Sequence, residues 1–152
     1  MPDQKSLADL LAESSIVLDA TAADVDDAIA QAGSALTAAG AVDAGYTALM
    51  LEREQTVSTY VGEGVAVPHG TLAARDAVAR NALVLLRFAD PIDWNGNDVY
   101  VVIGLAARGR GHIGLLSRLA GLLLEPERAL ALRNATTTDE VYAVFSLADE
   151  QP

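Results

Sequence analysis

Hydrophobic residues change their spacing several times along the chain, and these changes predict alternating helices and strands. Residues 81–88 and 99–107 are two almost continuous apolar runs of strand length, as in strands buried on both faces of a sheet. Residues 65–67 form a shorter β-prone run, which Pro68 ends. Elsewhere, apolar residues recur three and four positions apart, as on one face of a helix. The pattern therefore indicates an α/β fold.

Capping and turn residues set the bounds of the other elements. Thr, Asp and Pro favour helix starts, and Gly favours helix ends and turns. In the first third of the chain we expect a helix over 7–13, a strand over 15–18, a helix from a cap at Thr21 to Gly40 and a helix from a cap at Asp43 to about Gln55. The middle should hold a β-prone stretch over 56–61 and strands over 65–67, 81–88 and 99–107, with a turn-rich stretch over 90–97. The last part should hold a helix over 112–123, a short helix from Pro126 and a last helix capped by Thr137 or Thr138. We expect a single domain over residues 1–152, with a mixed central β-sheet flanked by helices on both faces in three layers.

The amino-acid composition excludes several kinds of site and cellular location. The chain has 152 residues and no cysteine, which excludes disulfides, thiolate metal sites and thiol nucleophiles. Charged residues near the N-terminus and apolar runs no longer than a strand argue against a signal peptide or a membrane span. We expect a cytoplasmic protein that does not insert into a membrane.

Charge is distributed unevenly. The formal net charge is −11, which disfavours binding to nucleic acid or to anionic lipid. Residues 53–118 hold seven Arg and six acidic residues, a net charge of +1, so the rest of the chain carries −12. The acidic surface is expected outside the segment that contains both histidines.

The two histidines, His69 and His112, are the candidates for covalent chemistry. His69 follows a predicted strand end and is surrounded by glycines that let a ligand approach, so we expect it to be exposed. A neutral imidazole can accept a phosphoryl group and pass it on. His112 is at a predicted helix N-terminus, where free N–H groups and the helix dipole favour phosphoryl oxygens. Arg53 could add fixed positive charge, with Arg108 and Arg110 as further candidates.

Each of these residues also has a plain structural interpretation. Either histidine could be a loop or capping residue, and Arg53 on a helix could be a solvated charge. Two distant histidines with no HExxH motif and no cysteine do not indicate a metal site. The stretch 109–114 matches GxGxxG only formally, because no ribose-binding acid follows at the required spacing.

Three stretches, in matching order, resemble a known family. They are MLERE at 50–54, TYVGEGVAVPHGT at 59–71, and VIGLAA at 102–107 leading to His112. They resemble the enzyme IIA domain of the mannitol and fructose branch of the bacterial phosphoenolpyruvate-dependent sugar phosphotransferase system, with the mannitol type most similar. The resemblance covers residues 12–145.

The resemblance implies a phosphoryl carrier. His69 would take the phosphoryl group on Nε2 from the phosphohistidine of the carrier protein HPr and pass it to a cysteine of enzyme IIB, which phosphorylates the incoming sugar. His112 matches the family's second active-site histidine, and Arg53 matches its arginine. The resemblance also implies a mixed sheet with flanking helices and neither a metal nor an organic cofactor. With no IIB or IIC portion in the sequence, a free-standing IIA is expected.

Two other functions remain open at the level of the sequence. A regulatory IIA of the nitrogen-related type would use the same histidine chemistry to control partner binding. A binding module without catalysis would keep the fold alone, which the presence of His69, His112 and Arg53 disfavours. The sugar, the IIB partner and the oligomeric state are not determined by this sequence.

Overall fold

The computed structural model describes residues 6–70, 77–108 and 111–149, with the backbone alone for 111–113 and 147–149. The helices and strands follow one another in the alternation that the sequence predicts. Their bounds are α1 Leu7–Leu10, β1 Leu11–Ala20, α2 Val25–Ala38, α3 Tyr46–Thr56, β2 Tyr60–Gly62, β3 Val65–Ala66, β4 Ala82–Trp94, β5 Asn97–Ala106, α4 Gly111–Leu123, α5 Pro126–Asn134 and α6 Thr138–Asp149.

The five strands form one mixed sheet in the order β1-β4-β5-β3-β2. The pairs β4–β5 and β2–β3 are antiparallel, whereas β1–β4 and β3–β5 are parallel. The short strand β3 thus runs in the same direction as β5, and the chain leaves both strands at the same edge of the sheet. The predicted mixed sheet is confirmed.

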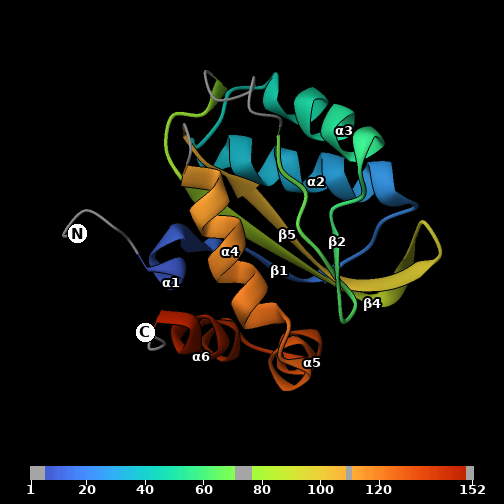
Figure 1. Cartoon of the computed structure of the whole chain (residues 1–152), viewed down its shortest axis with the longest axis vertical. Helices are drawn as coiled ribbons and strands as arrows, with labels where there is room; N and C mark the ends of the chain where they lie inside the picture. The colour runs from blue at the N-terminus through green and yellow to red at the C-terminus, as the bar shows by residue number, and fades with distance from the viewer. Residues whose placement is uncertain (1–5, 71–76, 109–110, 150–152) are drawn as a thin grey trace.

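Helices cover both faces of the sheet, and successive strand residues serve opposite faces. Leu83 and Leu85 pack in one buried cluster with α1, α4, α5 and α6, whereas Val84 and Leu86 pack in another with α2 and α3. Figure 1 shows α2 and α3 together on one side, with α4 crossing the other side above α5 and α6. This two-sided burial explains the continuous apolar runs and confirms the three-layer α/β fold.

Two predicted helix starts and the opening helix are wrong in detail. The opening helix ends at Leu10, because Leu11 pairs with Leu83 and the sheet outweighs the helical pattern. Asp24, and not Thr21, caps α2: its carboxylate accepts from the Asp27 N–H at 2.9 Å. Asp43 forms a local turn with Gly45, so α3 begins only at Tyr46.

The sequence predicts a turn-rich stretch over 90–97, but most of this stretch continues the two strands. Ile92 and Trp94 are buried between exposed neighbours, the alternation typical of a strand with one buried face. Only Asn95 and Gly96 make the turn, both at positive φ. Among the described helices, none is long and apolar enough to cross a membrane.

Candidate active site

His69 lies just past β3, beside the end of β5. It pairs in parallel with Leu105, whose N–H donates to the Pro68 carbonyl at 3.0 Å. The ladder between β3 and β5 therefore continues past the proline, and it draws His69 inward to 7 % exposure. The expectation of an exposed imidazole is wrong for this reason.

The imidazole of His69 is oriented by its own backbone. Its Nδ1 lies 2.9 Å from the carbonyl oxygen of Val67. A carbonyl oxygen only accepts hydrogen bonds, so this contact requires a proton on Nδ1. In the neutral ring the lone pair is then on Nε2, which makes Nε2 the nucleophilic atom.

A chain of hydrogen bonds holds the Val67 peptide in place. The Val67 N–H donates to the Thr59 carbonyl at 3.0 Å. The N–H and the hydroxyl of Thr59 both donate to the carboxylate of Glu54, which also accepts from Trp94 Nε1 at 2.9 Å. The orientation of His69 is thus connected, through two backbone segments, to one carboxylate on α3.

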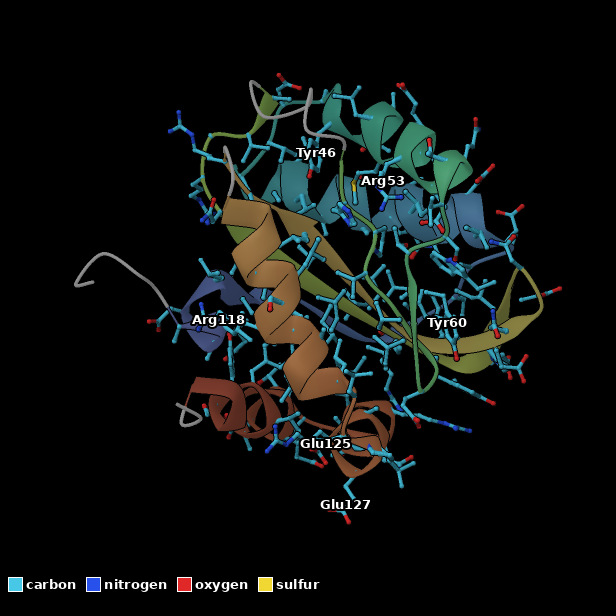
Figure 2. The ribbon with its side chains drawn as sticks, viewed as in Figure 1. Tyr46, Arg53, Tyr60, Arg118, Glu125 and Glu127 are labelled. Carbon is cyan, nitrogen blue, oxygen red and sulfur yellow. The ribbon has the colours of Figure 1, made fainter. Side chains whose placement is uncertain are left out.

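Arg53 lies on the inward stripe of α3. Positions 46, 50 and 53 are four and three residues apart and so share one helix face, on which Tyr46 and Met50 are buried. Figure 2 shows Tyr46 and Arg53 both extending from α3 toward the strands. Arg53 is half-buried as a residue, and its guanidinium donates to the Val57 carbonyl at 2.7 Å. Arg53 therefore binds the same short segment whose Thr59 holds Val67.

His112 is the second residue of α4, as the sequence predicts for a helix start. Its side chain lies outside the described part of the structure, so its contact with His69 stays a prediction. The backbone still limits its position: Gly111 comes four positions after Ala107, a span of at most about 14 Å. Figure 1 shows α4 beginning at the end of the sheet toward which β5 points. Both histidines are thus placed near the edge where β3 and β5 end.

Of the two other candidate arginines, the structure describes only Arg108. Arg108 is exposed, its N–H donates to the Asn81 side chain at 2.8 Å, and its guanidinium is 3.5 Å from the Ala79 carbonyl. Arg110 lies outside the described residues. A role for either arginine in holding phosphate therefore stays a prediction.

Tyr46 is a site residue that the sequence reasoning missed. Its buried hydroxyl donates to the Leu105 carbonyl and accepts from the Gly70 N–H, both at 2.9 Å. Burial raises the pKa of Tyr46, while the bond from Gly70 lowers it by less, so the phenol stays protonated at neutral pH. The one available signal was its spacing from Arg53, which places both on the same face of a helix.

Comparison with known proteins assigns the family. The family model described as "Phosphoenolpyruvate-dependent sugar phosphotransferase system, EIIA 2" matches residues 9–147. The chain belongs to this EIIA family. It is 37 % identical over 143 residues to the mannitol-specific phosphotransferase enzyme IIA component of Staphylococcus aureus, covering 94 % of this chain and 99 % of that protein.

Solved structures agree with the assignment. This EIIA chain superposes with a TM-score of 0.84 on Escherichia coli enzyme IIA of the mannitol system, solved in complex with phosphorylated enzyme IIB. The identity is 32 %, and the match covers 90 % of this chain and 99 % of that one. The nitrogen regulatory IIA protein of Neisseria meningitidis is 24 % identical with a TM-score of 0.76, a likeness of fold alone. As an EIIA family member, the chain is a phosphotransferase component of the mannitol type.

Proposed function

We propose that His69 is the phosphoryl carrier of this EIIA chain and that the phosphoryl group is attached to Nε2. The observation that carries the proposal is the hydrogen bond between Nδ1 and the Val67 carbonyl, because it leaves the lone pair of the neutral ring on Nε2. His112 and Arg53 are proposed to assist by stabilising the phosphoryl oxygens. All three residues belong to one EIIA domain spanning the chain.

The transfer breaks one bond to phosphorus as it forms another. The Nε2 lone pair attacks the phosphorus of a donor phosphohistidine, a new N–P bond forms, and the donor's N–P bond breaks to release a neutral imidazole. The positive charge that develops on the ring is stabilised at Nδ1–H by the Val67 carbonyl dipole. The N–H groups that begin α4 and the guanidinium of Arg53 supply the positive potential that the phosphoryl oxygens need.

We propose HPr as the donor and a cysteine of an enzyme IIB as the acceptor, with uptake of mannitol or a fructose-type sugar downstream. The mannitol-specific relative and the Escherichia coli complex of enzyme IIA with phosphorylated enzyme IIB support this assignment. In the onward step a thiolate attacks phosphorus, an S–P bond forms, and His69 regains its Nε2 lone pair.

The test is incubation of the chain with phosphorylated HPr, followed by intact mass measurement. We expect a gain of about 80 Da, one phosphoryl group. His69→Gln, which keeps a polar side chain of similar size, should show no gain. His112→Ala should still accept the group and pass it to enzyme IIB slowly. Because His69 is only 7 % exposed, the experiment also shows whether the donor can reach Nε2. A wild-type chain that stays unmodified would contradict the proposal.

A further inference from the structure

The backbone on both sides of His69 is fixed by three hydrogen bonds. The Val67 carbonyl binds Nδ1, the Pro68 carbonyl accepts from Leu105 N–H, and the Gly70 N–H donates to the hydroxyl of Tyr46. The first bond joins a backbone carbonyl to the His69 side chain, and the second joins two backbone groups. The third depends on the side chain of Tyr46, so substitution of Tyr46 can loosen the segment on its Gly70 side, whereas Thr59 and Glu54 hold the Val67 side.

Tyr46 also binds the strand that pairs with His69. Its hydroxyl donates to the carbonyl of Leu105, the residue that faces His69 in the ladder. One phenol oxygen thus joins Gly70 and Leu105, which are 24 and 59 residues away in sequence. With 3 % of Tyr46 exposed, little water can replace these bonds.

We propose that Tyr46 is a positioning residue for phosphoryl transfer: its hydroxyl ties Gly70 to Leu105, and this tie keeps the His69 ring turned with Nδ1 on Val67. The proposal rests on the proposed function, since it concerns the residue that accepts the phosphoryl group. Tyr46 acts through the backbone and is not required to touch the phosphoryl group or to exchange a proton.

Tyr46→Phe tests the proposal, since it removes the oxygen and keeps the ring. The Gly70 N–H and the Leu105 carbonyl lose their partner, so the segment 67–70 gains freedom. We expect the rate of transfer from phosphorylated HPr to fall ten- to a hundred-fold, as for a misplacement of about 1 Å, with a larger effect on kcat than on KM. Nitrogen-15 NMR of the unphosphorylated imidazole should show a smaller fraction of the Nδ1–H tautomer.

Tyr142→Phe is the matched control. The Tyr142 hydroxyl on α6 donates to the Leu11 carbonyl at 2.6 Å, and Leu11 is on β1, separated from β3 by β4 and β5. Both variants lose one tyrosine-to-carbonyl bond, so both lose stability, and rates are compared at a temperature at which each is folded. Only Tyr46→Phe should change transfer and the tautomer of His69.

Substitution of Tyr46 by 4-aminophenylalanine places a weaker donor and acceptor at the same position. This variant should give a transfer rate and an Nδ1–H tautomer fraction between those of the wild type and Tyr46→Phe. If Tyr46→Phe does not fold, this variant is compared with the wild type in its place. The proposal would be overturned if the Tyr46 variants kept the wild-type transfer rate and the wild-type tautomer fraction. It would also be overturned if Tyr142→Phe changed both quantities by as much as Tyr46→Phe. Lack of any phosphorylation of the wild type would overturn the proposed function and with it the role of Tyr46 in transfer. The NMR comparison needs no phosphate and would still decide whether Tyr46 orients the His69 ring.

Discussion

The two ends of β3 differ in how they are held, although only a few residues separate them. At the His69 end, buried bonds join residues 24 and 59 positions apart in sequence. At the other end, the turn before β3 borders an open hollow of about 370 Å³, where the Gly64 N–H donates to the Tyr60 hydroxyl only four residues away. Figure 2 shows Tyr60 far from Tyr46, toward α5.

The hollow is lined mainly by polar surface. Glu63 and Asp98 line it, and the guanidinium of Arg133 lies 3.5 Å from the centroid of the Tyr100 ring. The His69 end contains a nucleophilic side chain whose tautomer is fixed by its surroundings. The proposed site therefore differs from the hollow in the long-range bonds that converge on His69 and its neighbours.

The largest effect is expected from Glu54→Gln, at the far end of the chain of bonds from His69. The carboxylate accepts from three donors, two on Thr59 and one on Trp94, and an amide must turn its own N–H₂ toward one of them. We expect a loss of about 2–3 kcal/mol in the free energy of unfolding and at least a tenfold slower transfer. Urea denaturation and rapid-quench kinetics measure the two effects.

Glu52→Gln is the control for this prediction, because Glu52 is exposed on the same helix. It should change neither quantity. A wild-type transfer rate in Glu54→Gln would show that the hydrogen-bond chain from Glu54 to Val67 has no influence on His69.

Arg53→Lys should have the next largest effect. Lysine keeps the positive charge but lacks the planar fork that can bind the Val57 carbonyl and still face a phosphoryl oxygen. Transfer should slow about tenfold, while thermal unfolding changes little. If Arg53→Lys transferred the phosphoryl group at the wild-type rate, the positive charge of Arg53 alone would account for its role.

A smaller effect is expected from salt. The net charge of −12 outside residues 53–118 should attract a donor with a basic docking surface. Raising the ionic strength from about 0.05 to 0.5 M should slow second-order transfer several-fold, because the Debye length shortens. A rate independent of salt would contradict steering by this surface and would leave the chemistry at His69 unaffected.

Arg133→Ala should have the smallest effect and tests the hollow directly. Removing the guanidinium from the Tyr100 ring should cost about 0.5–1 kcal/mol of stability and leave transfer unchanged. Thermal unfolding and the phosphorylation rate are the readouts. A transfer defect as large as that of Arg53→Lys would mean that the two ends of β3 act together.

Local signals in the sequence predicted most of the fold. Pro126 begins α5, and Gly40 adopts the positive φ that ends α2. Both could be predicted because Pro and Gly act on the backbone next to them. Two errors concern neighbouring residues: Asp24 and not Thr21 caps α2, and Ile92 and Trp94 pair with Val99 and Asn97 across a tight turn. The opening helix is wrong because a distant residue decides, since Leu11 pairs with Leu83.

The site was predictable only in part, for the same reason. Residue chemistry indicated His69, His112 and Arg53 as candidates and the resemblance implied their roles. The position of His112 at a helix start is confirmed for its backbone. The burial of His69 was not foreseen, because it results from pairing with Leu105. Tyr46 and Glu54 were not identified either. Spacing places Tyr46 on the helix face of Arg53 but does not predict its bonds to Gly70 and Leu105, and Glu54 accepts from Trp94, 40 residues away.

The position of the phosphoryl group on the ring is the sharpest test of His69 as the phosphoryl carrier. The chain is labelled with nitrogen-15, phosphorylated by HPr, and examined by NMR for the coupling of phosphorus to each imidazole nitrogen. We expect one phosphorylated histidine, His69, with phosphorus bonded to Nε2 and the proton retained on Nδ1 beside Val67. Phosphorus on Nδ1 of His69, or on His112, would contradict it.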